Sequence, residues 1–226
     1  WQKIIDNMYL PMIKNTNVFL QNDGFMDKEM LSYNNIPINQ RPISQNWSWD
    51  RILRSVYIKQ ADVLQGLYFF ESDFNYNTIR DNVLYYEPFT VHESSLSPSI
   101  HSILFSLLND SEKAYEMYLR TSRLDLDDYN NEVHEGLHIT SMAGTWLSIV
   151  EGFAGVRFKN TDLHVAPIIP KNWKSYQFKM IYKNEPLKII INSKSITIVN
   201  LGNRHEVIVY IFDKKYVVND SITIKC

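Results

Sequence analysis

The stretch that decides the fold covers residues 139–158 and reads "ITSMAGTWLSIVEGFAGVRF". Its first three turns carry the most strongly patterned helix of the chain, because apolar residues recur at helical spacing at Ile139, Met142, Ala143, Trp146, Leu147 and Val150. The segment "GFAG" (152–155) then ends the pattern, and prolines follow at Pro167, Pro170 and Pro186. We therefore expect helices before this stretch and strands after it.

Upstream of this stretch the periodicity is helical. Pro98 suits a first helical position with Ser97 as the cap, and the apolar repeat behind it consists of Ile100, Ile103, Leu104, Leu107 and Leu108. A further helix is expected from near Ser111, ending in the acidic loop "DLDDYNNEVHEG" (125–136). Residues 48–71 also predict a helix, and Gln60 interrupts its apolar face.

Downstream, short β-rich runs are separated by turn formers. These runs are "LKIIIN" (187–192), "SITIV" (195–199), "EVIVYIF" (206–212) and "KKYVV" (214–218). Short strands at such spacing are typical of an antiparallel sheet or sandwich. The predicted fold class is therefore mainly α plus a β domain, divided into residues 1–158 and residues 159–226.

Composition narrows the class of protein. The chain has 226 residues, 45% of them apolar and 13% aromatic, which is ample for a packed core. A net charge of −2 without basic runs argues against nucleic acid as a partner, and no stretch is long and apolar enough for a membrane span. Cys226 is the single cysteine, so we expect no internal disulfide and a reducing, cytoplasmic location. The chain opens on Trp1 within a helical pattern, which suggests a piece of a longer protein.

Three polar residues next to helix starts are candidates for a phosphate site. Ser94 and Ser95 in "HESSLSP" (92–98) precede one helix, and His138 in "EGLHITS" (135–141) begins another, with Gly136 allowing close backbone approach. The amino end of a helix has unpaired N–H groups and a partial positive charge, so it binds anions. The alternative is structural, because serines ahead of a helix most often cap it.

Other polar and aromatic residues leave two interpretations open. Lys59 and Gln60, near an apolar helical stripe, either contact a sugar or form an internal salt bridge. The aromatic residues Tyr85, Tyr86, Trp47 and Trp49 could stack on a sugar, although such residues are usually core. The acidic run 125–128 is either a cation site or a solvated loop. The sequence lacks glycine-rich phosphate-loop, CxxC and GxSxG motifs, and we expect no metal or organic cofactor.

Three long segments resemble glycoside hydrolase family 65. They are "SWDRILRSVYIKQADVLQG" (48–66), "YYEPFTVHESSLSPSIHS" (85–102) and "KAYEMYLRTSRLDLDDYNNEVHEGLHITSMAGTWLSIVEGFAGVRF" (113–158), within a match from about residue 38 to 158. The resemblance implies part of an (α/α)6 barrel followed by a small antiparallel β-sheet or sandwich domain. It also implies reversible, inverting phosphorolysis of an α-linked glucose disaccharide and a homodimer. Maltose is favoured over trehalose and kojibiose by overall likeness.

The resemblance also assigns site residues. The family's phosphate contacts match Ser94, Ser95 and His138, and its glucose contacts match Lys59 and Gln60. Its general-acid glutamate lies in a "DEY" type loop upstream of the matched region, and no such motif occurs in this chain. We therefore expect no catalytic residue here, a missing amino-terminal portion as a partner, and a chain that is inactive alone.

Two alternatives to the phosphorylase interpretation remain. The first is a hydrolase of the same fold, in which Glu93 or Glu135 would serve as the base that activates water. The second is a noncatalytic sugar-binding or scaffold segment. Release of glucose without phosphate would indicate the hydrolase.

Overall fold

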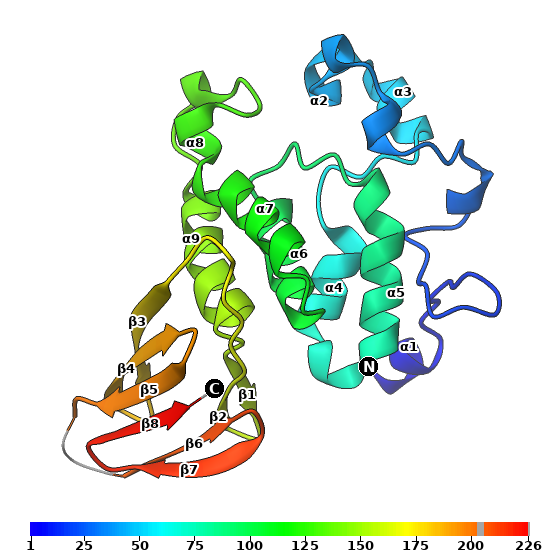
Figure 1. Cartoon of the computed structure of the whole chain (residues 1–226). Helices are drawn as coiled ribbons and strands as arrows, with labels where there is room; N and C mark the ends of the chain where they lie inside the picture. The colour runs from blue at the N-terminus through cyan, green and yellow to red at the C-terminus, as the bar shows by residue number, and fades with distance from the viewer. Residues whose placement is uncertain (203–205, 226) are drawn as a thin grey trace.

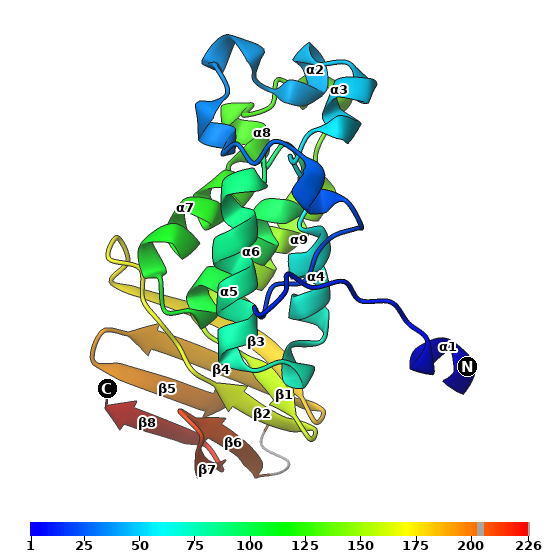
Figure 2. The same ribbon diagram turned by 90° about the vertical axis from the view of Figure 1, so that its right-hand side faces the viewer.

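The computed structural model describes residues 1–202 and 206–225, and shows a helical part followed by a β part (Figure 1). Cys226 and residues 203–205, which belong to the expected turn between the runs 195–199 and 206–212, lie outside the described residues. The predicted order of helices and then strands is confirmed. In Figure 2 the helices stand above the β part, and the amino-terminal helix α1 stands away from the others.

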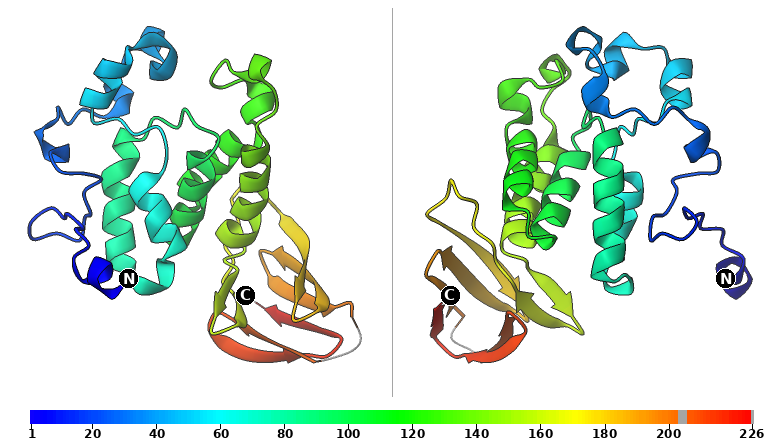
Figure 3. Two further views of the ribbon diagram at one scale, coloured as in Figure 1. Left: turned by 180° about the vertical axis from the view of Figure 1, so that it is seen from behind. Right: turned by 45° about the vertical axis from the view of Figure 1, so that its right-hand side comes forward.

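Nine α-helices, six short 3-10 helices and a π-helical turn form the helical part of the described chain. The helices are α1 (Gln2–Asp6), α2 (Ile43–Asn46), α3 (Trp49–Arg54), α4 (Asp62–Phe69), α5 (Tyr76–Tyr86), α6 (Ser97–Leu107), α7 (Ser111–Ser122), α8 (Leu124–Asp127) and α9 (Ile139–Leu147). The π-helical turn Ser148–Phe153 prolongs α9 toward the β part (Figure 3). The helices predicted from Pro98, Ser111 and Ile139 are thereby confirmed.

The single helix predicted across 48–71 is wrong. The segment holds α3 and α4, separated by an extended stretch in which Ile58 forms a parallel bridge with Thr90. Lys59 and Gln60 lie in this break and are exposed at the surface, so Gln60 does not interrupt a buried helical face. Helix α6 also begins one residue earlier than predicted, and Ser97 is its first residue rather than its cap.

Helices α6 and α9 pack through small residues. A Cβ atom added to Gly144 of α9 would lie 2.7 Å from the Cβ of Ser99, and one added to Gly152 would lie 3.5 Å from the Cα of Ile103. Since 144 faces 99 and 152 faces 103, the two helices run parallel. The buried hydroxyl of Ser148 donates to the carbonyl of Gly144, one turn earlier in the chain, so this hydroxyl has a hydrogen-bond partner without help from α6.

The apolar stripe that predicts α9 is largely exposed along the helix, and only its last residue, Val150 in the π-helical turn, is buried in a core. Ile139, Met142 and Trp146 are exposed, while Ser141, Gly144 and Ser148 form the buried face. The strongest periodicity in the sequence therefore marks the surface of the described chain.

The β part consists of two four-stranded sheets with orders β1-β2-β6-β7 and β3-β4-β5-β8. The strands are β1 (Arg157–Lys159), β2 (Asp162–Val165), β3 (Ser175–Tyr182), β4 (Glu185–Asn192), β5 (Ser195–Asn200), β6 (Val207–Ile211), β7 (Lys214–Val218) and β8 (Ser221–Lys225). Neighbouring strands are antiparallel except β2 and β6, which are parallel. The predicted antiparallel sandwich is confirmed, and β1, β2, β3 and β8 are strands that the sequence analysis did not identify.

Each part has its own apolar core. The sandwich core joins side chains from both sheets, among them Leu163, Leu187, Ile189, Ile198 and Val209. The helical core is centred on Leu64, Val83, Tyr86, Leu104 and Phe153. Arg157 links the two parts, because its guanidinium binds both carboxylate oxygens of Glu71 at 3.0 and 2.8 Å and the carbonyl of Glu151. The predicted division after residue 158 falls inside β1 and stays a prediction.

Candidate functional site

The segments that lead into α4 and α6 lie side by side. The backbone N–H of Ile58 donates to the carbonyl of Phe89, and the N–H of Val91 donates to the carbonyl of Ile58. Because this bridge is parallel, both chains pass it in the same direction before their helices begin. Lys59 and Gln60 therefore precede α4 at the same end of the helical part at which Ser94 and Ser95 precede α6.

His138 lies at this end too. It precedes α9, which runs parallel to α6 with Gly144 opposite Ser99, so His138 projects beyond that contact in the direction of the loop before α6. Helix α7 runs the opposite way: its last turn meets the first turn of α9, where Thr121 and Ser141 exchange hydrogen bonds. All five predicted site residues thus stand before the amino ends of α4, α6 and α9, at one end of the helical part.

Asp125 fixes the ring of His138. The Nδ1 atom of His138 lies 2.5 Å from one carboxylate oxygen of Asp125, and its backbone N–H donates to the other at 2.9 Å. Burial raises the pKa of Asp125, but the hydrogen bonds from His138 outweigh it and hold this pKa below its ordinary value. With Nδ1 engaged, the Nε2 atom is the one that a substrate can use, and its nearest carboxylate is Glu132 at 3.9 Å. Neither interpretation of the acidic run 125–128, a cation site or a solvated loop, predicts this contact of Asp125 with His138.

Ser94 and Ser95 differ in their surroundings. Ser94 is buried, and its hydroxyl accepts a hydrogen bond from the backbone N–H of Leu96, so it shapes the turn ahead of α6. Ser95 is half-buried. Glycine at position 136 adopts a φ of 115° that other residues avoid, and a Cβ there would meet open space, so the close approach expected at Gly136 is not what requires it.

Glu93 clamps the loop that carries the two serines. Its carboxylate accepts the backbone N–H groups of Ile43 and Ser44, at 2.6 and 2.9 Å, and the phenol of Tyr33 at 3.0 Å. Burial first, and then the charge of Glu93, raise the pKa of Tyr33. Glu93 is 2% exposed and already accepts three hydrogen bonds, which leaves it unsuited to activate a water molecule as a base.

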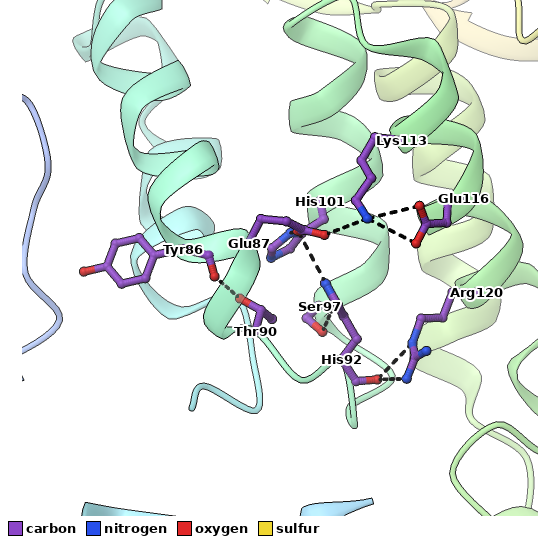
Figure 4. A network of polar contacts seen from close by, with 9 residues as sticks. All are labelled: Tyr86, Glu87, Thr90, His92, Ser97, His101, Lys113, Glu116 and Arg120. Atoms are coloured by element: carbon purple, nitrogen blue, oxygen red, sulfur yellow. Dashed lines mark hydrogen bonds and ion pairs between the residues drawn. The ribbon is translucent and has the colours of Figure 1, made fainter. Parts of the chain in front are cut away.

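His92, the residue before Glu93, is held by contacts with α7 and α6. Its φ of 54° is in the left-handed region, and the Arg120 guanidinium of α7 donates to its carbonyl at 2.9 and 3.2 Å. Its Nδ1 atom lies 3.1 Å from the hydroxyl of Ser97, the first residue of α6. Figure 4 shows both contacts, together with the carboxylate of Glu87 beyond the imidazole ring.

The carboxylate of Glu87 gathers two imidazoles and an ammonium group. One oxygen lies 2.5 Å from Nδ1 of His101 and 3.5 Å from Nε2 of His92, and the other lies 3.2 Å from Nζ of Lys113. Burial by itself would raise the pKa of Glu87, but its bonds with His101 and His92 hold it well below the ordinary value. Burial and the neighbouring His101 lower the pKa of His92 to about 4, so this ring is neutral at pH 7.

Glu87, His92 and His101 offer ligand atoms within 4.8 Å of one another, as a metal site would. Two donors on one tetrahedral zinc ion stand roughly 3.3 Å apart, given metal–ligand distances of about 2.0 Å. The 2.5 Å separation of Glu87 and His101 is that of a hydrogen bond, and Lys113 brings a positive charge to the same carboxylate. The geometry therefore fits a proton-sharing network better than a cation site.

Two family models match the chain. The model described as "Glycosyl hydrolase family 65 central catalytic domain" covers residues 1–147, and "Glycosyl hydrolase family 65, C-terminal domain" covers residues 156–218. The chain belongs to glycosyl hydrolase family 65. The family resemblance drawn from the sequence is confirmed, and the helices are a segment of the family's catalytic domain.

Family-65 relatives match nearly the whole chain. Maltose phosphorylase of Bacillus subtilis (strain 168) is 50% identical over 87% of this chain and 26% of its own length. An α,α-trehalose phosphorylase of Thermoanaerobacter brockii is 39% identical over 95% of this chain and 28% of its own length. A solved structure named "Putative kojibiose phosphorylase from human microbiome" superimposes with a TM-score of 0.93 and 39% identity, over all of this chain and 31% of that one. The chain spans about a quarter of the length of these curated relatives.

Among the described residues, no helix is long and apolar enough to cross a membrane.

Proposed function

We propose that this chain is the part of a family-65 disaccharide phosphorylase that binds phosphate and one side of the glucose unit. The observation that carries the proposal is the common position of Ser94, Ser95, His138, Lys59 and Gln60 ahead of three helix starts. The unpaired N–H groups and positive ends of α6 and α9 favour an anion there, and serine hydroxyls add donors.

In the proposed reaction, an oxygen of inorganic phosphate attacks the anomeric carbon of the glucose unit. The bond from that carbon to the glycosidic oxygen breaks on the opposite face, so the products are β-glucose 1-phosphate and free glucose. A glutamic acid protonates the departing oxygen, and phosphate takes the place of the water and base of an inverting hydrolase. Within this chain, Ser94, Ser95 and His138 hold the phosphate, while Lys59 and Gln60 orient the glucose.

The general acid is not assigned to this chain. Its "DEY" type motif does not occur in the sequence, and Glu93, the buried carboxylate next to the serines, already accepts three hydrogen bonds. We therefore expect no turnover of maltose and phosphate by the isolated 226-residue chain. Turnover by that chain would contradict this assignment.

Maltose is the proposed substrate. The identity of 50% to a maltose phosphorylase, against 39% to a trehalose phosphorylase and 35% to a kojibiose phosphorylase, supports this choice. The first experiment is to incubate the full-length protein that carries this sequence with each disaccharide, with and without inorganic phosphate, and to assay glucose 1-phosphate. Product from maltose that requires phosphate is the expected result. Glucose released equally without phosphate would indicate the hydrolase instead.

A serine variant tests the phosphate site within the same assay. Ser95→Ala removes a donor, and we expect the KM for phosphate to rise about tenfold. Ser111→Ala is the matched control, because Ser111 begins α7, whose amino end lies at the opposite end of the helical part. An unchanged KM for phosphate in Ser95→Ala would remove this residue from the site. The expected homodimer and cytoplasmic location stay predictions, and light scattering of the full-length protein tests the first.

A further inference from the structure

We propose that Glu87 is a positioning residue which, through His92, holds the serine-bearing loop in the conformation that binds phosphate. The inference rests on the proposed function, since phosphate must be the substrate of this loop. Glu87 lies at the end of α5, outside the loop, and none of its contacts includes Ser94 or Ser95.

The connection from Glu87 to the serines passes through one residue. The carboxylate of Glu87 faces Nε2 of His92, while Nδ1 of the same ring contacts Ser97 at the start of α6. The imidazole therefore lies between the end of α5 and the beginning of α6. One residue, Glu93, separates His92 from Ser94, and its carboxylate binds two backbone N–H groups of α2. A shift of the His92 backbone would move the serines or break the bonds of Glu93.

The unfavourable backbone conformation of His92 must be stabilised by contacts with its surroundings. A left-handed φ of 54° at a residue with a Cβ atom costs free energy, so the surrounding contacts must keep it there. Arg120 binds the carbonyl, but only the ring contacts fix the orientation of the side chain. The Nε2 atom of His92 is buried beside His101 and has no hydrogen-bond partner among the described residues, and the carboxylate of Glu87, 3.5 Å away, is the polar group that faces it.

The charge of Glu87 matters as well as its hydrogen bonds. Its carboxylate faces Lys113 of α7 and the imidazoles of His92 and His101, and Lys113 also pairs with Glu116 at 3.0 Å (Figure 4). An uncharged side chain in place of Glu87 would leave Lys113 paired with Glu116 alone. It would also put an amide donor against either Lys113 or one of the imidazoles, and so reorient the cluster.

The test compares Glu87→Gln with Glu116→Gln in the full-length enzyme. Both variants remove a carboxylate from Lys113, but Glu116 is largely exposed and contacts neither histidine. We expect Glu87→Gln to raise the KM for phosphate about tenfold, with kcat and the KM for maltose changed less than about threefold. Glu116→Gln should keep all three parameters. Equal changes in the phosphate and maltose KM values would mean a general structural defect and overturn the inference.

A second variant keeps the test open if Glu87→Gln fails to fold. Ser97→Ala removes only the hydroxyl that His92 contacts and leaves the carboxylate in place. We expect a smaller rise in the KM for phosphate, about threefold, again without a change in the KM for maltose. An unchanged KM for phosphate would contradict the inference.

Two controls separate the remaining explanations. Dialysis of the wild-type enzyme against EDTA should leave phosphorolysis unchanged, and a loss that zinc restores would make the cluster a metal site and overturn the hydrogen-bonded network. Wild-type enzyme that forms no glucose 1-phosphate would overturn the proposed function, and this inference with it. If wild type requires phosphate and Glu87→Gln behaves like Glu116→Gln, the inference alone fails.

Discussion

The α6–α9 contact and the sandwich core bury opposite kinds of surface. In the sandwich, alternating apolar residues such as Ile189 and Ile191 point inward and their neighbours outward. Between α6 and α9, the buried residues are Ser99, Gly144 and Ser148, and the apolar stripe of α9 faces outward. In this chain the apolar pattern predicts the buried face of the strands, but not the buried face of α9.

The largest effect is expected in the sandwich. Ile189→Ala should lower the free energy of unfolding by about 4 kcal/mol, because Ile189 is 0% exposed and its removal leaves a cavity between the sheets. Ile181→Ala is the control, since Ile181 is 75% exposed, and it should change this free energy by less than about 0.5 kcal/mol. Urea unfolding of the 226-residue chain measures both. A small effect at Ile189 would mean that the sheets are loosely packed.

The close approach of α6 and α9 predicts that a glycine-to-alanine substitution in α9 destabilises the chain, which is the opposite of the usual effect in a helix. Alanine in a helix interior is normally favoured over glycine by about 1 kcal/mol. Gly144→Ala should nevertheless destabilise the chain by about 2 kcal/mol, because its Cβ would lie 2.7 Å from Ser99 and force α6 and α9 apart. Gly66→Ala in α4, where a Cβ meets nothing within 4 Å, should stabilise it. Equal effects at the two glycines, measured by urea unfolding, would disprove the close packing of α6 and α9.

The polar cluster of the helical part predicts a loss of stability in acid. The pKa of His92 falls to about 4 on folding from an ordinary 6.5, so the unfolded chain binds more protons between these values. The contribution of His92 to the free energy of unfolding is fully present above about pH 6.5. We expect this free energy to fall by roughly 1 kcal/mol from pH 7.5 to pH 5.5. Glu87, whose pKa is also lowered, adds a loss of the same sign at lower pH. His92→Asn should show a flatter dependence in urea unfolding, and an equally steep one would exclude His92 as its source.

The smallest effect is expected on the exposed face of α9. Met142 is 49% exposed, so Met142→Gln should change the free energy of unfolding of the 226-residue chain by less than about 0.5 kcal/mol. Met117→Gln in α7 is the matched control, because Met117 is 3% exposed and burying an amide there should cost several times more. Similar losses for the two variants would mean that the stripe of α9 is covered in solution.

Sequence patterns predicted the positions of helices and strands better than the contacts that these elements make with one another. The strands β4 to β7 follow from alternation and turn formers, and α6, α7 and α9 from helical spacing. The break between α3 and α4 could not be foreseen, because the bridge of Ile58 to Thr90 joins residues far apart in sequence. The inward face of α9 was not predicted for a similar reason, since only the position of Ser99 makes Gly144 a contact.

The candidate site shows the same limit. Ser94, Ser95 and His138 were selected from their places before helix starts and from the family resemblance. Asp125 was not, because its bond to His138 depends on how α8 folds back toward α9. Glu87 carried no signal either, since its partners His92, His101 and Lys113 come from three different segments. A local sequence pattern does not indicate which charged groups from distant segments will pair in the folded chain.

The bridge between Ile58 and Thr90 has a consequence for how this sequence can diverge. Each bonded residue stands only a few positions before the side chains proposed to touch glucose and phosphate. An inserted or deleted residue between 58 and 62, or between 90 and 97, would move one set of contacts relative to the other. Length changes in descendants of this protein should therefore accumulate elsewhere, for example in the exposed turns of the β sandwich.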